Sequence, residues 1–269
     1  MDILNGGELA EKAASLFPKR IIFFDLDGTL ALSKADLDRE MAELLRALLG
    51  KKTVSVIGGG GFLQFQKQFL DKLAACSAKE LANLFIQPTS GAKMYRFVDN
   101  IWQLEYNNTL TEEEKSIIFS MFPQALRDID YIEPEITYGE VLEDRESQIT
   151  FSALGQKAPL EEKEKWKREE NGLRLKLKAA LEEYLPEFEV RVAGTTSVDV
   201  TKKGIDKAYG VGKLLEILDS RVDDAVYIGD SLFEGGNDHA VFKTGIDTIQ
   251  VNHVDDTKHI VGKFLEADK

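Results

Sequence analysis

Short apolar runs in the first part of the chain predict buried strands. Residues 21–24 are an unbroken apolar run, residues 53–57 are rich in β-branched side chains, and residues 84–87 form a third run. Between the first two runs, apolar residues recur with helical spacing, which predicts a helix that begins near Ser33 and ends at Gly50. Strands that alternate with helices are typical of a parallel sheet with helices on both faces.

The pattern changes near residue 97. Ile149, Phe151 and Ala153 alternate with Thr150 and Ser152, which predicts an antiparallel strand with one apolar and one polar face. This segment therefore indicates a separate α+β domain. Its other predicted elements are helices at 111–128 and 160–184 and strands at 188–193 and 197–201.

The parallel pattern returns near residue 204, with a helix predicted over 207–218 and strands over 225–228 and 246–251. We therefore predict an α/β protein: a Rossmann-like, doubly wound parallel sheet core into which an α+β cap domain is inserted. An inserted domain of this kind commonly serves as a lid over a site. The predicted bounds are residues 1–96 and 204–269 for the core and 97–203 for the cap.

Composition excludes several classes of function. The 269 residues include 34 basic and 47 acidic ones, a formal charge of −13, which argues against nucleic acid or an anionic membrane as the partner. Cys76 is the single cysteine, so an intramolecular disulfide and a cysteine-based metal site are excluded. The first residues do not resemble a signal peptide, and no run of about 18 apolar residues occurs. We therefore predict a cytoplasmic protein without a membrane segment.

Two carboxylates directly follow the first buried run. Asp25 and Asp27 stand at the end of the predicted strand, where buried negative charge is costly unless a cation lies beside it. Ligands of parallel sheets bind at the carboxyl ends of strands, and two other such ends carry the glycine run 58–61 and Asp230. Carboxylate and backbone oxygens suit Mg²⁺, which we predict as the cofactor. The predicted metal ligands are Asp25, Asp27, Asp230 and Asp238.

The same residues suit transfer of a phosphoryl group. Asp25 is ionised at neutral pH and can attack phosphorus without an activating base, which forms an aspartyl phosphate. Asp27 can protonate the leaving oxygen and then deprotonate an attacking water. The metal and Lys207 would neutralise the phosphoryl oxygens, while Gly28 turns backbone N–H groups toward the phosphate and Thr29 adds a hydroxyl donor.

Simpler interpretations stay open for three of these features. The glycine run is either a flexible turn or a cradle in which the N–H groups of Gly59 and Gly60 hold the phosphate. Considered without the other segments, Lys207 would be interpreted as a surface lysine near the start of a helix. Asn237 and Asp238 form an ordinary helix N-cap, a role that can coexist with a role in the site.

Taken together, these segments resemble the haloacid dehalogenase-like superfamily of phosphotransferases. Their order matches the superfamily: Asp25-Leu-Asp27-Gly-Thr29, the glycine turn, Lys207 in Gly204-Ile-Asp-Lys207, and Gly229-Asp230 with Asn237-Asp238. The long insert after the second segment resembles the α/β cap of subfamily IIB, the branch of the Cof-type sugar phosphatases and the eukaryotic-type phosphomannomutases. The ending Gly235-Gly-Asn-Asp-His239 is most similar to the phosphomannomutases.

The resemblance also implies residues of the cap that bind substrate. Asp144-Arg145, Ser152-Ala-Leu-Gly155 and Ser197-Val-Asp199 are similar to segments of the phosphomannomutases that contact the sugar phosphate. The predicted substrate- and phosphate-binding residues are Gly28, Thr29, Lys34, Gly59, Gly60, Arg145, Gln156, Ser197, Asp199 and Asn237. A homodimer formed through the cap is a further expectation.

Three departures from the family weaken the expected hold on a second phosphate. Gln156 stands where the mutases have an arginine, Lys34 replaces another arginine, and the glycine turn ends in Gly60-Gly61 rather than Ser-Asp. An amide binds phosphate less strongly than a bidentate guanidinium, although Lys157 is placed to compensate. The sequence therefore favours a Mg²⁺-dependent phosphatase of small phosphorylated metabolites, sugar phosphates above all. The alternatives are a phosphomannomutase that interconverts mannose 6-phosphate and mannose 1-phosphate, and a non-catalytic sugar-phosphate sensor.

Overall fold

The computed structural model describes residues 16, 18–33, 35–170 and 172–267. It divides into two compact units, a core (Met1–Asn107 with Asp206–Lys269) and a cap (Asn108–Ile205). The core therefore extends about ten residues beyond the division expected at 96/97. The reason is that residues 93–107 form a hairpin whose first strand pairs with the core sheet.

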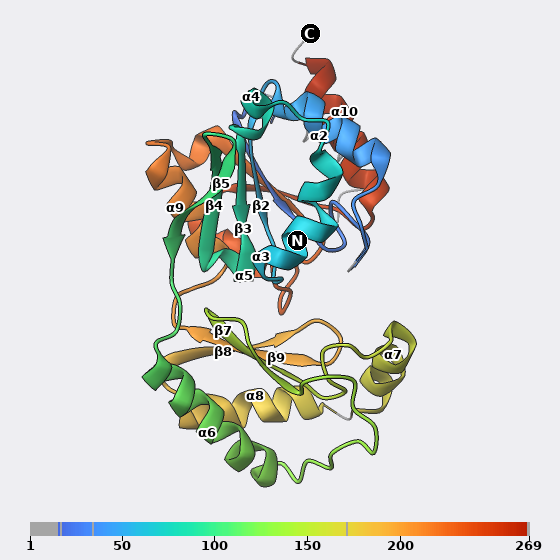
Figure 1. Ribbon diagram of the computed structural model, residues 1–269, viewed down its shortest axis with the longest axis vertical. Helices are drawn as coiled ribbons and strands as arrows, with labels where there is room; N and C mark the ends of the chain where they lie inside the picture. Colours follow the sequence, from blue (N-terminus) through green and yellow to red (C-terminus); the bar gives the residue numbers. More distant parts are fainter. Residues whose placement is uncertain (1–15, 17, 34, 171, 268–269) are drawn as a thin grey trace. The chain divides into compact units, whose positions relative to one another are not determined.

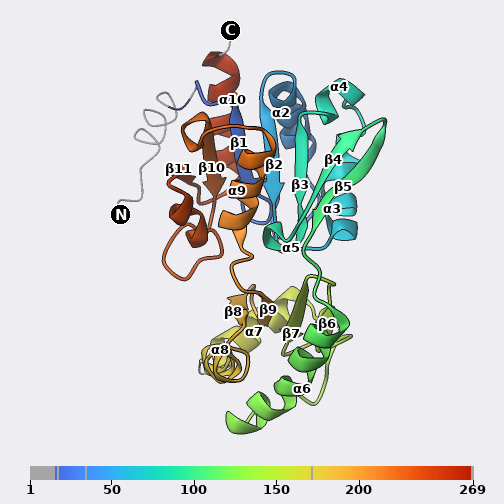
Figure 2. The ribbon, with the colours of Figure 1, turned by 90° about the vertical axis from the view of Figure 1, so that its left-hand side faces the viewer.

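The core sheet has seven strands in the order β11-β10-β1-β2-β3-β4-β5 (Figure 2). The five strands from β11 to β3 are parallel, and the hairpin β4-β5 is joined to them in antiparallel orientation. This arrangement confirms the predicted α/β class. The strands are β1 (Ile21–Asp25), β2 (Thr53–Ile57), β3 (Leu84–Gln87), β4 (Lys93–Val98), β5 (Ile101–Asn107), β10 (Ala225–Gly229) and β11 (Asp247–Gln250).

Alternation along β1 directs its side chains to two separate hydrophobic clusters. Ile22 and Phe24 pack in the cluster that contains residues of α2 and α10, whereas Ile21 and Phe23 pack in the cluster that contains residues of α9. Because side chains alternate along a strand, Asp25 follows Phe23 onto the α9 face. The helical segments of the core are α2 (Arg39–Leu49), α3 (Phe62–Gln68), η1 (Leu70–Leu73), α4 (Ala78–Leu81), α5 (Pro88–Gly91), α9 (Lys207–Ile217), η2 (Val222–Asp224), η3 (His239–Thr244) and α10 (Val254–Ala267).

The helix expected to begin near Ser33 begins later, at Arg39. Asp38 is its N-cap, because the Asp38 carboxylate accepts a hydrogen bond from the Met41 amide at 2.8 Å. The preceding residue, Leu37, donates its amide to the Gln68 carbonyl instead of joining the helix. The expected end at Gly50 is confirmed.

The cap is a four-stranded antiparallel sheet in the order β6-β7-β9-β8, with α6 and α8 packed together against it (Figure 1). Phe122, Phe151 and Leu177 are fully buried between them. The charged helix expected over 160–184 is two helices, because Gly172 adopts a left-handed conformation with φ +74°. The cap elements are α6 (Glu112–Asp128), β6 (Leu142–Asp144), β7 (Gln148–Ser152), α7 (Leu160–Glu169), α8 (Leu173–Tyr184), β8 (Phe188–Ala193) and β9 (Ser197–Lys202).

Among the described residues, none of the helices combines the length and the hydrophobicity that a bilayer crossing requires.

A capping box at the start of α6 contributes to the stability of the cap. Thr111 accepts a hydrogen bond from the Glu114 amide at 3.2 Å, and the Glu114 carboxylate accepts one from the Thr111 amide at 2.6 Å. We expect Thr111→Ala to lower the free energy of unfolding of the cap by about 1 kcal/mol, because the backbone amide of Glu114 loses its partner. Urea denaturation followed by circular dichroism measures this loss. Glu113→Ala, in the same turn but outside the box, is the control, and an equal loss in both variants would contradict the assignment.

Candidate active site

Lys207 connects two carboxylates that are far apart in the sequence. It is the first residue of α9, whose start is capped by Asp206. Its ammonium group donates one hydrogen bond to Asp25 at the end of β1 and another to Oδ1 of Asp238 at 2.7 Å. All three side chains are buried, with exposed fractions of 2% for Asp25, 1% for Lys207 and 0% for Asp238. Lys207 is therefore not a surface lysine.

Asp238 is held by donors from three directions. The Tyr227 hydroxyl donates to its Oδ1 atom at 2.5 Å, beside Lys207, and the Ser231 amide donates to its Oδ2 atom at 3.0 Å. Asp238 also precedes the 3₁₀ helix η3, but its side chain makes no capping hydrogen bond there. Asp238 therefore occupies the N-cap position, but its carboxylate is used in the site and not for capping.

A third carboxylate, Asp230, completes an acidic group. One oxygen from each of Asp25, Asp230 and Asp238 lies within 4.8 Å of the others. Three carboxylates face a single ammonium group, so the charge of the group is balanced only when a divalent cation is added. Burial raises the pKa of Asp25 well above its usual value, Lys207 lowers it, and the Asp238 carboxylate raises it again.

The donor atoms of this group fit a hard cation. Within the described part of the chain, the buried Oδ2 atom of Asp25 has no hydrogen-bond partner. A buried carboxylate oxygen without a donor is unfavourable unless a cation or a ligand satisfies it. Three carboxylates are the oxygen ligands that Mg²⁺ prefers in proteins.

Two glycines allow these carboxylates to approach the backbone. A Cβ atom on Gly28, which has φ +90°, would lie 2.6 Å from Oδ2 of Asp230. A Cβ atom on Gly229 would lie 2.5 Å from Oδ2 of Asp238. Gly28 is therefore required both for its backbone conformation and for the space that Asp230 occupies.

The carboxylate of Asp27 does not belong to the acidic group, although the sequence analysis predicts it as a metal ligand. Its Oδ1 atom accepts a hydrogen bond at 2.9 Å from the side-chain amide of Gln68, the last residue of α3. Asp27 lies two residues after Asp25, beyond the end of β1, where strand alternation no longer sets the direction of the side chain. Its predicted role as acid and base stays a prediction.

The glycine run after β2 is anchored to a strained turn after β3. The amides of Thr89 and Ser90 donate to the carbonyls of Gly60 and Gly58 at 2.9 and 2.8 Å. Thr89 and Ser90 have φ +49° and +56°, a conformation that costs free energy for residues other than glycine. These hydrogen bonds favour an ordered loop over a flexible turn. Phosphate binding by Gly59 and Gly60 stays a prediction, as does the role of Thr29, whose side chain is fully buried.

In the cap, the structure brings Arg145 and Gln156 together. The guanidinium of Arg145 donates to the side-chain oxygen of Gln156 at 2.9 Å and to the carboxylate of Glu143 at 2.5 Å. Lys163 donates to the backbone carbonyl of Gln156 at 3.3 Å. Burial raises the pKa of Asp199, and the charge of Arg145 acts in the opposite direction. These residues form a second polar group, within the cap.

Three further residues were predicted to bind substrate or phosphate: Ser197, Asn237 and Lys34. Ser197 begins β9, two residues before Asp199, and is half-buried. Asn237 is exposed in the loop between β10 and η3. Lys34 lies outside the described residues.

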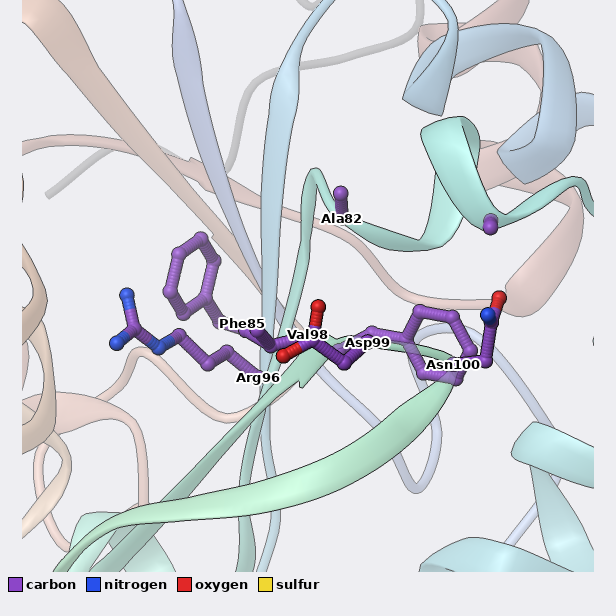
Figure 3. A pocket seen from close by; sticks show the side chains of 8 residues that line it. Ala82, Phe85, Arg96, Val98, Asp99 and Asn100 are labelled. Atoms are coloured by element: carbon purple, nitrogen blue, oxygen red, sulfur yellow. The ribbon is translucent and has the colours of Figure 1, made fainter.

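A surface hollow of ≈ 480 Å³ lies elsewhere on the core (Figure 3). It is lined by Phe85 near the start of β3 and by Asp99 and Asn100 at the tip of the β4-β5 hairpin. The acidic group lies at the carboxyl ends of β1 and β10, so the hollow belongs to the other edge of the sheet. It contains none of the residues that the sequence predicted for the site.

Gln68 and Tyr227, whose side chains contact Asp27 and Asp238, were missed by the sequence analysis. Gln68 is buried although it is polar, and it directly precedes the buried Phe69. Tyr227 is the one residue with a polar atom in the side chain within β10. A polar residue at a position expected to be buried was the available signal in both cases.

The chain is similar in sequence to known phosphomannomutases. A profile of the eukaryotic phosphomannomutase family matches residues 41–267. A phosphomannomutase of Encephalitozoon cuniculi is 28% identical over 262 residues, which cover 92% of this chain and 94% of that protein. The phosphomannomutase of Saccharomyces cerevisiae is 27% identical over 265 residues, 96% of this chain and 98% of that protein.

Solved structures of lower identity share the fold. A trehalose-6-phosphate phosphatase of Aspergillus fumigatus superposes with a TM-score of 0.58 at 15% identity and covers 99% of both chains. A C-terminally truncated IMP-nucleotidase of Plasmodium falciparum gives a TM-score of 0.71 at 16% identity, over 97% of this chain and 75% of that one.

We expect the acidic group to bind Mg²⁺. Asp25→Asn and Asp230→Asn should each weaken Mg²⁺ binding about tenfold or more, because each removes one charged ligand. Isothermal titration calorimetry with MgCl₂ measures the affinity. Asp199→Asn, which changes a carboxylate of the cap, is the matched control. Unchanged affinity in Asp25→Asn would show that the group is not a metal site.

Proposed function

The chain belongs to the eukaryotic phosphomannomutase family of haloacid dehalogenase-like enzymes, and we propose that it is a Mg²⁺-dependent mutase that interconverts mannose 6-phosphate and mannose 1-phosphate. The observation that supports this most is the buried contact of Lys207 with Asp25 and Asp238, next to Asp230. Relatives called phosphomannomutases that align over more than nine-tenths of the chain support the same choice. The sequence alone favours a phosphatase and gives the mutase as the alternative. Here the mutase becomes the first candidate and the phosphatase the second.

The proposed chemistry begins at Asp25. Its oxygen attacks one phosphorus of a hexose bisphosphate, the bond from that phosphorus to the sugar oxygen breaks, and Asp27 gives its proton to that oxygen, which leaves a hexose monophosphate. The product is an aspartyl phosphate on Asp25. Bound Mg²⁺ would supply positive charge to the phosphoryl oxygens, and Lys207 keeps a second positive charge against Asp25.

Return of the phosphoryl group completes the reaction. A hydroxyl group of a hexose monophosphate attacks the aspartyl phosphate, Asp27 takes the proton of that hydroxyl, and Asp25 is released as a carboxylate beside a hexose bisphosphate. Gln68 holds Oδ1 of Asp27 and so orients the group that moves the proton. A mutase of this kind passes through a sugar bisphosphate, so we propose that the enzyme requires a hexose bisphosphate as activator.

We propose that the polar group of the cap recognises the part of the substrate that does not react. Arg145 and Lys163 provide positive charge for a second phosphate, and Asp199 and Ser197 provide acceptors for sugar hydroxyls. Arg145 is already paired with Glu143, so its binding of phosphate competes with this ion pair.

A phosphatase is the second candidate, and Gln156 is the observation that favours it. Its amide oxygen accepts from Arg145, and its amide nitrogen can offer a phosphate only an uncharged donor. A hexose monophosphate that is held weakly leaves before its hydroxyl accepts the phosphoryl group, and water then attacks the aspartyl phosphate instead. The non-catalytic sensor has no comparable support, since a binding protein has no use for the Asp25–Lys207 contact. The cytoplasmic location and the homodimer stay predictions.

The product distinguishes the two enzymatic functions. With Mg²⁺ and a catalytic amount of glucose 1,6-bisphosphate, we expect mannose 1-phosphate to become mannose 6-phosphate, followed by phosphorus-31 NMR. Release of inorganic phosphate without isomerisation would favour the phosphatase. Absence of both products would refute both functions. Asp25→Asn is the control, since it should abolish either product.

Gln156→Arg tests whether residue 156 decides between isomerisation and hydrolysis. A guanidinium at this position should strengthen the hold on the second phosphate and raise the ratio of isomerisation to hydrolysis roughly tenfold, the value of one charge-assisted hydrogen bond. Both rates are measured in the same NMR experiment. Gln124→Arg on the exposed face of α6 adds the same charge elsewhere in the cap, and an equal change in that variant would contradict the assignment.

A further inference from the structure

Tyr227 places a hydroxyl group inside the core sheet, directly below the acidic group. It is the middle residue of β10, pairs with Phe23 of β1 in the sheet, and is fully buried. Its cluster also contains Val211 and Leu214 of α9. A phenylalanine would fill the same apolar space, so the packing alone does not account for the hydroxyl.

The Tyr227 hydroxyl contacts Asp238, the carboxylate that competes with Asp25 for the ammonium group of Lys207. Oδ1 of Asp238 accepts from both Tyr227 and Lys207, at 2.5 and 2.7 Å, while the same ammonium group also donates to Asp25. The position of Lys207 between its two carboxylates depends on which of them attracts it more strongly. A neutral donor on Oδ1 takes up part of the negative charge of Asp238 and so weakens its attraction for the ammonium group.

We propose that Tyr227 is a positioning residue: its hydroxyl supports Asp238 so that Lys207 stays in contact with Asp25. Asp238, which has three protein donors, holds Lys207 in this arrangement. The inference rests on the proposed function, in which Asp25 and Lys207 carry the transfer of the phosphoryl group.

Tyr227→Phe keeps the ring and removes the hydroxyl. Asp238 then draws Lys207 away from Asp25, and we expect kcat to fall about tenfold, with KM for mannose 1-phosphate changed less than about twofold. The affinity for Mg²⁺, measured by calorimetry, should stay the same. A merely structural role would lower the stability of the fold without this separation of kcat from KM.

Tyr106→Phe is the matched control. Tyr106 is a half-buried tyrosine of the same unit whose hydroxyl donates to the backbone carbonyl of Gly91 at 2.8 Å and not to Asp238. Its removal should lower the urea midpoint of unfolding by an amount similar to that in Tyr227→Phe, with kcat unchanged. A loss of kcat of the same size in both variants would overturn the proposal.

A double-mutant cycle tests whether the hydroxyl acts through Asp238. In the Asp238→Asn background, Tyr227→Phe should have no further effect on kcat, because no carboxylate is left to draw Lys207 away. If Tyr227→Phe lowers kcat equally with and without Asp238→Asn, the hydroxyl does not work through this carboxylate and the proposal is wrong.

A readout without turnover separates this inference from the proposed function. With ¹⁵N-labelled lysine, the Nζ resonance of Lys207, identified by its loss in Lys207→Arg, should shift in Tyr227→Phe and stay in place in Tyr106→Phe. If the wild-type protein converts no hexose phosphate but this shift is seen, the proposed function fails and the positioning role stands. If the protein is active and neither the resonance nor kcat changes, the positioning role fails alone.

Discussion

The site depends on one buried cation that is shared by two carboxylates. Lys207 is the single ammonium among the described residues that contacts Asp25 and Asp238, and all three side chains are buried. Removing one member of a buried ion pair leaves an uncompensated charge, which is strongly destabilising. The contact therefore requires that β1, α9 and the loop after β10 keep fixed relative positions. Adjacent parallel strands and a helix that begins at the carboxyl edge of the sheet provide these positions.

Backbone geometry makes the approach of these charges feasible. Gly28 and Gly229 leave space for the carboxylates of Asp230 and Asp238 where any other residue would place a Cβ atom. The left-handed turn after β3 holds the glycine run by hydrogen bonds from its amides. Its positive φ values persist because the surrounding structure compensates their cost, as is common near functional sites.

The two units divide the proposed function between them. In the proposed function the core groups form and release the aspartyl phosphate, and this step is the same for a mutase and a phosphatase. The outcome then depends on the acceptor, a sugar hydroxyl or water, and so on how long a hexose monophosphate is held beside the aspartyl phosphate. Gln156, paired with Arg145 in the cap, is one of the three positions at which the sequence analysis expects a departure from the family. A small change in the cap can therefore change the product without changing the core.

The sequence by itself determined the fold class, the candidate nucleophile Asp25, and the three carboxylates of the acidic group, Asp25, Asp230 and Asp238. It also wrongly placed Asp27 in this group. These features depend on local patterns: an apolar run that ends in carboxylates predicts both a buried strand and a site at its end. Only the tertiary structure decided that Asp27 lies outside the acidic group, that Gln68 holds it, and that Tyr227 supports Asp238. It also decided that the β4-β5 hairpin belongs to the core. Each of these depends on the direction of a side chain beyond a strand end, or on pairing between distant segments, and neither leaves a periodic signal in the sequence.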